Sequence, residues 1–290
     1  MFKGAMTAIV TPFKEGKVDE KALQKLIEFQ IKGGIKGIIP CGTTGESATL
    51  AFEEHKRVVE ITISTVNKRV PVIAGAGSNN TEEALELTKF AKSKGADGAL
   101  LITPYYNRPT PRGLFLHYEK IARSVDIPII IYNVPTRTGT NILPQTVSEL
   151  AKISNIIGIK EATGDMKQAS EIIRLCGDRF TMLSGDDYTI LPFLSIGGHG
   201  VISVAANIVP GMVSRLVEGF FNNNLVQAKE LHYKLFPVIK ALFLETNPIP
   251  VKTALSMMGM ILPELRLPLC QMSEENSNAL KSMLKANGLI

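Results

Sequence analysis

The chain carries eight short runs of apolar, mostly β-branched residues along its first two hundred or so positions. Between most of them lie stretches in which apolar side chains recur with helical spacing, as at Leu23, Leu26 and Ile27. Short runs that are apolar throughout are typical of parallel strands buried on both faces. The pattern therefore predicts strands that alternate with helices, with the strands at 5–10, 37–40, 70–74, 98–102, 128–132, 156–160, 180–184 and 200–204.

Boundary signals support the helices of this pattern. Asp19 and Thr81 each precede acidic residues and are good helix N-caps, and Pro144 suits the first turn of a helix. Gly33 and Gly95 follow helical stretches and are plausible helix stops. We therefore expect helices to begin or end close to these positions.

Eight strand–helix units over about 220 residues have the size of a closed parallel (β/α)8 barrel. An open doubly wound sheet is the competing architecture, but it usually has a glycine-rich dinucleotide loop after its first strand, and none is present here. The G-x-G at 75–77 has Asn80 where a third glycine is needed. We predict an α/β fold with a TIM barrel at 1–224 and a C-terminal helical domain at 225–290, whose helices lie near 225–243, 250–258 and 273–286.

In a barrel of this kind, catalytic groups lie where strands end and loops begin. Lys160 and Tyr132 end two of the runs, and Thr43 and Thr44 lie in a glycine-containing turn after another. Burial among Ile and Val favours the neutral amine that attacks a carbonyl carbon, and a tyrosine with a threonine hydroxyl can move the protons that imine formation requires. Arg137 offers a planar fork for a substrate carboxylate. Each residue alone has an ordinary structural interpretation, but together they favour an imine-forming enzyme.

Composition and charge limit which partners and cofactors the protein is expected to bind. The net charge of +5 is scattered among acidic residues, so we expect no nucleic-acid partner. The three cysteines are far apart and fit a reduced cytoplasm, and no apolar run approaches membrane-spanning length. The start lacks a signal-peptide pattern, so we expect a cytoplasmic protein with no membrane partner. Four dispersed histidines do not suggest a metal site, and no cofactor is indicated.

Four motifs resemble, in order and spacing, those of the dihydrodipicolinate synthase family, also called the 4-hydroxy-tetrahydrodipicolinate synthases. They are Gly42-Thr43-Thr44-Gly45-Glu46-Ser47, Tyr132-Asn133-Val134-Pro135-Thr136-Arg137-Thr138-Gly139, Gly158-Ile159-Lys160-Glu161-Ala162 and Glu245-Thr246-Asn247-Pro248-Ile249-Pro250-Val251-Lys252. The resemblance covers the chain from Gly4 nearly to its end. It implies a class I aldolase-type barrel and a homotetramer built as a dimer of dimers. It also implies a lyase of lysine and diaminopimelate biosynthesis that condenses pyruvate with L-aspartate 4-semialdehyde.

The resemblance also implies a role for individual residues. Lys160 is similar to the Schiff-base lysine, and Tyr132, Thr43 and Tyr106 resemble a proton relay in which Tyr106 comes from the neighbouring subunit. The remaining matches concern substrate binding. They are Thr44 with the Thr43 backbone for the pyruvate carboxylate, Arg137 for aspartate 4-semialdehyde, and Gly185 and Ile202 as pocket contacts.

Sister families share the barrel, the lysine and the tyrosine. N-acetylneuraminate lyase and the keto-deoxy-sugar acid aldolases usually lack the threonine pair and the arginine, so an aldolase for a sugar-derived 2-oxo acid is the alternative function. A catalytically silent regulator that binds a 2-oxo acid is a third hypothesis. The combination of lysine, tyrosine and hydroxyl groups argues against it, because a binding module needs no proton relay.

Many relatives in the family are inhibited by lysine at the dimer interface. The matching positions here are Ser47, Ala48, His55, Asn79, Glu83 and Tyr105. Phe52 departs from the pattern, because lysine-sensitive members often have a histidine there. We therefore expect weak or absent inhibition, and a polar interface patch without a ligand is the alternative interpretation of these residues.

Overall fold

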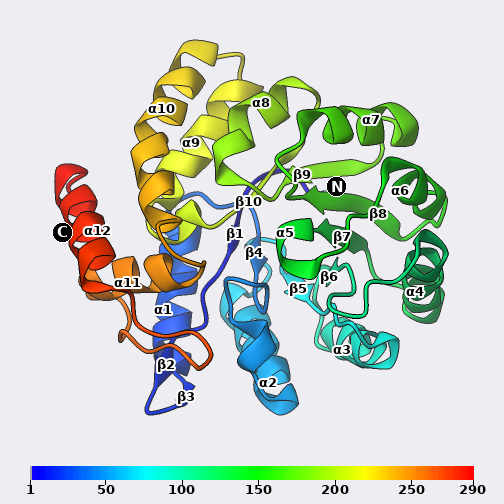
Figure 1. Ribbon diagram of the computed structural model, residues 1–290, viewed down its shortest axis with the longest axis horizontal. Helices are drawn as coiled ribbons and strands as arrows, with labels where there is room; N and C mark the ends of the chain where they lie inside the picture. The colour runs from blue at the N-terminus through cyan, green and yellow to red at the C-terminus, as the bar shows by residue number, and fades with distance from the viewer. Residues whose placement is uncertain (1) are drawn as a thin grey trace.

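Eight parallel strands form the centre of the computed structural model, which describes residues 2–290 (Figure 1). They follow one another in the order β4-β1-β10-β9-β8-β7-β6-β5, and a parallel bridge between Ile38 and Val72 brings the two edges together. Each predicted run overlaps one strand, so the predicted barrel is confirmed. The strands are β1 (Gly4–Ala8), β4 (Ile38–Ile39), β5 (Ile73–Gly75), β6 (Gly98–Ile102), β7 (Ile129–Asn133), β8 (Ile156–Glu161), β9 (Thr181–Ser184) and β10 (Gly200–Ser203).

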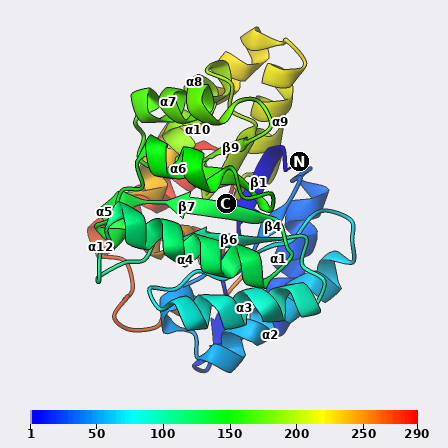
Figure 2. The same ribbon diagram turned by 90° about the vertical axis from the view of Figure 1, so that its right-hand side faces the viewer.

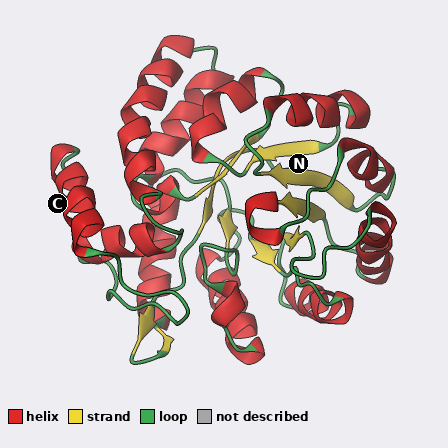
Figure 3. Cartoon of the chain, in the orientation of Figure 1, coloured by secondary structure: helices red, strands yellow, loops and turns green. Residues whose placement is uncertain are grey.

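Helices surround these strands on the outside, as Figures 2 and 3 show. The barrel helices are α1 (Glu20–Lys32), α2 (Phe52–Val66), α3 (Thr81–Ser93), α4 (Pro111–Ser124), α6 (Pro144–Leu150), α7 (Met166–Cys176), α8 (Ile190–Ser195) and α9 (Pro210–Phe221). Short helical turns follow four strands: η1 (Ser47–Thr49), α5 (Pro135–Thr138), η2 (Asp187–Thr189) and η3 (Ala205–Asn207). Three more helices, α10 (Leu225–Leu242), α11 (Ile249–Met257) and α12 (Glu274–Ala286), confirm the predicted C-terminal helices.

The helix boundaries confirm most of the predicted caps. The Asp19 side chain accepts a hydrogen bond from the Ala22 amide at the start of α1, and α6 begins at Pro144. At α3 the predicted cap is wrong by one residue, because Asn80 accepts from the Glu82 amide. The Thr81 hydroxyl lies 2.9 Å from Nδ1 of His117 on α4 instead. Thr81 therefore joins two helices rather than capping one.

A small hairpin between the first strand and α1 was not predicted. It pairs β2 (Phe13–Lys14) with β3 (Lys17–Val18), and it lies beside α1 in Figure 1. Glu15 and Gly16 both have positive φ, as a tight two-residue hairpin turn requires. Strands of two residues are too short to show a period of two, so the hydrophobic pattern could not reveal them.

Side chains of the strands alternate between two apolar regions. On β7, Ile130 and Tyr132 belong to a cluster inside the barrel, together with Leu183 and Ile202 from other strands. Ile129 and Ile131 belong to a cluster that packs under the surrounding helices. This alternation decides which strand-end residues point into the barrel interior. Within residues 2–290, no helix combines the length and apolar character needed to cross a membrane.

Candidate active site

The site is built around Lys160, which lies near the end of β8. Its neighbour Ile159 packs in the outer cluster, so the alternation of the strand directs Lys160 inward. The side chain is only 5% exposed, and Nζ lies 4.2 Å from the centre of the Tyr132 ring. Tyr132 and Lys160 are also paired in the register of β7 and β8. The structure thus brings together the two residues that the sequence singled out at strand ends.

Two glycines lie where strands and side chains approach closely around the lysine. A Cβ on Gly158 would lie 2.3 Å from the carbonyl oxygen of Thr181, so β8 can approach β9 only with glycine at this position. A Cβ on Gly185 would lie 3.0 Å from Cε of Lys160. Gly185 therefore borders the lysine, and Ile202 belongs to the interior cluster that also contains Tyr132; their role as pocket contacts stays a prediction.

A polar network lies behind this pair, on the side of the strands that faces the helices. Glu161 is buried and accepts hydrogen bonds from the Thr163 amide, the Asn133 side chain and the Gln168 side chain. Asn133 and Glu161 are the next register pair after Tyr132 and Lys160. The network therefore fixes the end of both strands and, through them, the position of the two inward side chains.

The turn after β4 supplies Thr43 and Thr44. It is closed by main-chain hydrogen bonds from the Gly45 and Glu46 amides back to Gly42 and Thr43. Thr44 is 2% exposed, and its Oγ1 accepts a hydrogen bond of 3.0 Å from Nδ2 of Asn247. Thr43 is half-buried and lines a cavity of about 440 Å³.

Arg137 lines the same cavity from α5, the short helix that follows β7. Its guanidinium is exposed, and Nη2 donates a hydrogen bond of 2.8 Å to the main-chain oxygen of Asn247. The other N–H groups of the guanidinium remain able to bind a carboxylate. Tyr106 lies in the loop after β6 and is 90% exposed, so within this chain it stands apart from Lys160 and Tyr132.

The cavity also collects most of the residues matched to lysine inhibition. Ser47, Ala48, His55, Glu83 and Tyr105 line it together with Phe52. Asn79 adjoins them, and its Nδ2 donates a hydrogen bond of 3.2 Å to the Tyr105 carbonyl. Burial lowers the pKa of His55, and the hydrogen bond of 2.7 Å between its Nε2 and the Gly75 carbonyl oxygen partly opposes this effect.

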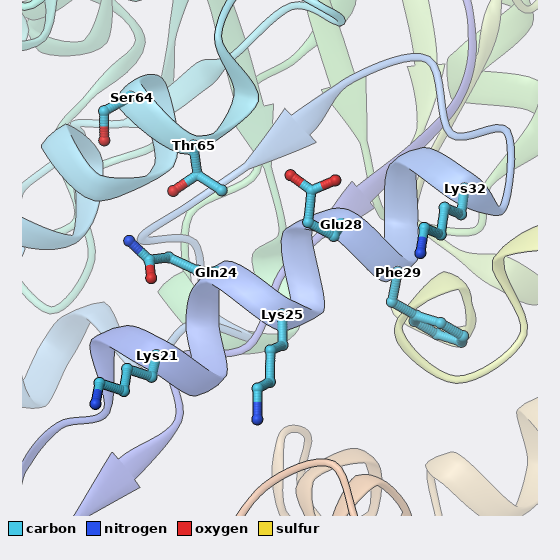
Figure 4. Close-up of a pocket in the computed structure, with 8 residues that line it drawn as sticks. All are labelled: Lys21, Gln24, Lys25, Glu28, Phe29, Lys32, Ser64 and Thr65. Carbon is cyan, nitrogen blue, oxygen red and sulfur yellow. The ribbon is translucent and has the colours of Figure 1, made fainter.

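A larger but more open hollow of about 730 Å³ lies outside the barrel, between α1 and α2 (Figure 4). Its lining includes Lys21, Lys25 and Lys32 of α1, with Ser64 and Thr65 on the facing helix. None of the predicted catalytic residues lies there. Within residues 2–290, no group of three or more His, Cys, Asp or Glu side chains is arranged to hold a metal ion.

Sequence reasoning assigned no role to three buried polar residues beside the site. Asn247 joins Thr44 to Arg137, and Lys252 forms an ion pair with Glu46 in which both side chains are 1% exposed. Burial lowers the pKa of Lys252, and the Glu46 carboxylate opposes this effect. All three lie within the motifs named from the sequence. The available signal for a buried ion pair was the charged residue Lys252 directly after the apolar stretch at 248–251.

Comparison with known proteins gives full-length matches. The model of the dihydrodipicolinate synthetase family matches residues 1–287. The 4-hydroxy-tetrahydrodipicolinate synthase of Thermodesulfovibrio yellowstonii is 61% identical over 290 residues, which cover both chains completely.

Two solved structures are also closely similar to this chain. The dihydrodipicolinate synthase of Acinetobacter baumannii, described as chloride-inhibited and complexed with pyruvate, has a TM-score of 0.98 and 46% identity over 100% of both chains. The enzyme of Cyanidioschyzon merolae, with lysine bound, has a TM-score of 0.97 and 39% identity over 100% of this chain and 99% of its own.

Proposed function

Because this chain belongs to the dihydrodipicolinate synthase family, we propose that Lys160 is the amine through which it performs the reaction of that family. The activity is that of a 4-hydroxy-tetrahydrodipicolinate synthase, a lyase of lysine and diaminopimelate biosynthesis. It condenses pyruvate with L-aspartate 4-semialdehyde through a lysine Schiff base. The observation that carries the assignment to Lys160 is its buried amine over the Tyr132 ring at the end of β8.

The proposed steps are those that the reaction of the family implies for an amine at this position. Neutral Nζ of Lys160 attacks C2 of pyruvate, and loss of water from the carbinolamine leaves an imine. Loss of a proton from C3 gives the enamine, whose C3 attacks the aldehyde carbon of the second substrate. The amine of that substrate then displaces Lys160 as the ring closes, which returns the free lysine.

Protons must move at the carbinolamine and at the new alkoxide. Tyr132 borders Nζ of Lys160, and we assign it this transfer together with Thr43 and Tyr106. Thr44 and the Thr43 backbone bind the pyruvate carboxylate in this proposal, and Arg137 binds aspartate 4-semialdehyde. Supporting this, Thr43 and Arg137 line one cavity and Asn247 joins Thr44 to Arg137. The complex of the A. baumannii protein with pyruvate agrees with the choice of first substrate.

Borohydride trapping tests the assignment of Lys160. Incubation with pyruvate and borohydride should leave a reduced pyruvyl adduct on Lys160, located by peptide mapping. Aspartate 4-semialdehyde should diminish this adduct by consuming the enamine, whereas an aldolase for sugar-derived 2-oxo acids would not respond to it. Lys160→Met should abolish the adduct, and Lys152→Met, which changes an exposed lysine paired with Glu149, should not. An adduct on another lysine would contradict the assignment.

We further propose that the active unit is an oligomer, a dimer of dimers, in the cytoplasm. Tyr106 is 90% exposed in the single chain, which suits a side chain that enters the site of a neighbouring subunit. Mixing Lys160→Ala subunits with Tyr106→Phe subunits should then restore activity, because a hybrid dimer contains one complete site. Failure of complementation in verified hybrids would show that Tyr106 acts within its own chain or not at all.

Lysine inhibition is proposed to be weak, although the C. merolae protein binds lysine. The candidate site is the cavity that Ser47, His55, Glu83 and Tyr105 line, and Phe52 presents an apolar ring to it. Phe52→His should increase inhibition by added lysine in steady-state assays. Sharp inhibition of the unchanged enzyme by sub-millimolar lysine would contradict the proposal.

A further inference from the structure

Asn247 contacts both proposed substrate anchors, although it lies in the connection between α10 and α11. Its Nδ2 donates to Oγ1 of Thr44, and its main-chain oxygen accepts from Arg137. The residue is 6% exposed and lines the cavity that Thr43 and Arg137 share. A residue from the C-terminal helical region thus joins the two anchors of the barrel.

We infer that Asn247 is a positioning residue that orients the hydroxyl group of Thr44 for the pyruvate carboxylate. This inference rests on the proposed role of Thr44 in binding pyruvate. A hydroxyl group can donate one hydrogen and accept through two lone pairs. The amide N–H of Asn247 occupies a lone pair, so the Thr44 hydrogen stays available, and a carboxylate is purely an acceptor.

The surroundings hold Asn247 in this place. Five residues further on, Lys252 forms its buried ion pair with Glu46, two residues after Thr44. The segment 247–252 is therefore fixed to the threonine turn at two points. Oδ1 of Asn247 is buried and has no hydrogen-bond donor within the described residues. The bond to Thr44 is therefore the one hydrogen bond that the side chain makes there.

The two contacts of Asn247 differ in a way that an experiment can use. Only the contact to Thr44 depends on the side chain, whereas Arg137 binds a main-chain oxygen that every substitution retains. Removing the side chain should therefore weaken the binding of pyruvate and leave the binding of aspartate 4-semialdehyde nearly unchanged. A general loosening of the site would affect both substrates.

Steady-state kinetics of Asn247→Ala, with each substrate varied in turn, test this difference. The KM for pyruvate should rise about 5- to 20-fold, the effect of a hydrogen bond that supports a charged ligand. The KM for the semialdehyde should stay within about twofold, because the contact to Arg137 is retained. In a Thr44→Val background, Asn247→Ala should add less than about twofold to the KM for pyruvate, since its effect passes through Thr44. Asn287→Asp, a change at the far end of α12, is the control and should alter neither KM.

Asn247→Asp keeps the shape of the side chain and covers the case in which Asn247→Ala fails to fold. An ionised carboxylate can only accept, so it takes the Thr44 hydrogen and also repels pyruvate. The KM for pyruvate should rise more than in Asn247→Ala near neutral pH and fall again towards pH 5, as the new carboxyl group becomes protonated and able to donate. If Asn247 had a purely structural role, the KM for pyruvate of Asn247→Asp would not fall again at low pH.

Trapping with borohydride at saturating pyruvate separates this inference from the proposed function. An adduct on Lys160 in the unchanged enzyme, with equal KM changes for both substrates in the Asn247 variants, would overturn the inference alone. Additive effects of Asn247→Ala and Thr44→Val would also overturn it. Absence of the adduct on Lys160 would overturn the proposed function itself.

Discussion

At the scale of single residues, the reactive lysine depends on a neighbour that has no side chain. Gly185 follows β9, and an added Cβ would lie 2.6 Å from Cβ of Ala162 and 3.0 and 3.1 Å from Cε and Cγ of Lys160. The 2.6 Å separation from Ala162 is shorter than carbon atoms tolerate, so the loop must shift, and the separations from Lys160 are tight enough that its side chain must yield by a few tenths of an ångström. The absence of a side chain at Gly185 therefore leaves the space beside which the Lys160 side chain lies.

Gly185→Ala should consequently impair catalysis as well as stability. Displacing a reacting group by about 1 Å can cost on the order of 100-fold in rate, and overpacking typically costs about 1–3 kcal/mol of stability. We expect kcat and the rate of borohydride-trapped imine formation to fall together by at least about tenfold. Gly211→Ala is the matched control, because its nearest contact would be Arg215 at 3.5 Å. Normal imine formation in Gly185→Ala would show that Lys160 does not need this space.

At the scale of elements, the apolar runs were sufficient to predict the strands, because parallel strands are buried on both faces and leave a continuous signal. The strand ends then predicted that Lys160 and Tyr132 meet. Contacts from the C-terminal segment could not be predicted in this way. Asn247 meets Thr44 across 203 positions of sequence, and neither residue belongs to a periodic pattern that would indicate the other.

The packing of α3 on α4 includes another contact between residues far apart in the sequence, that of Thr81 with His117. His117 on α4 is buried, and burial lowers its pKa from 6.5 to about 4. Nδ1 lies beside the Thr81 hydroxyl, while Nε2 has no hydrogen-bond partner within residues 2–290. Protonation would place a positive charge on a buried ring, so the folded state holds the neutral imidazole near neutral pH.

Stability should therefore decline in acid through this histidine. Between about pH 4 and pH 6.5 the unfolded chain binds a proton at His117 that the folded chain does not bind. The free energy of unfolding then rises with pH across this window, by at most about 3 kcal/mol from this residue. Denaturant unfolding at several pH values should show a shallower dependence for His117→Gln than for the unchanged chain. Parallel curves for the two proteins would contradict a neutral buried His117.

At the scale of the whole molecule, the proposed domains at 1–224 and 225–290 share one apolar core. Leu235 and Ile239 of α10 and Leu255 of α11 belong to the same buried cluster as Leu26 of α1 and Val58 of α2. Figure 1 shows α10 beside α9 and α11 beside α12. The C-terminal helices therefore help to support Thr44 and Arg137, the proposed substrate-binding residues of the barrel. We expect regions 1–224 and 225–290 to unfold in one transition.

Polar contacts reinforce this shared core around Phe13. Nζ of Lys252 lies 4.2 Å from the centre of the Phe13 ring, and Cζ of Arg266 lies 4.3 Å from it. Arg266 also binds Glu54 of α2 and the Gly16 carbonyl of the hairpin. The unpredicted hairpin thus serves as an attachment point for the C-terminal segment.

The ion pair between Lys252 and Glu46 should be the most sensitive of these contacts. Both side chains are 1% exposed, so Lys252→Met would leave the Glu46 carboxylate buried without its cation. Loss of one partner from a buried pair typically costs about 3–5 kcal/mol, and we expect a decrease of this size in the free energy of unfolding measured with urea. Glu46→Gln combined with Lys252→Met should be more stable than Lys252→Met alone, because the uncompensated charge is gone. Lys281→Met on the exposed face of α12 should change stability by less than about 0.5 kcal/mol. If Lys252→Met were as stable as Lys281→Met, the prediction would be contradicted, and the Lys252–Glu46 pair would not hold the C-terminal helices to the threonine turn.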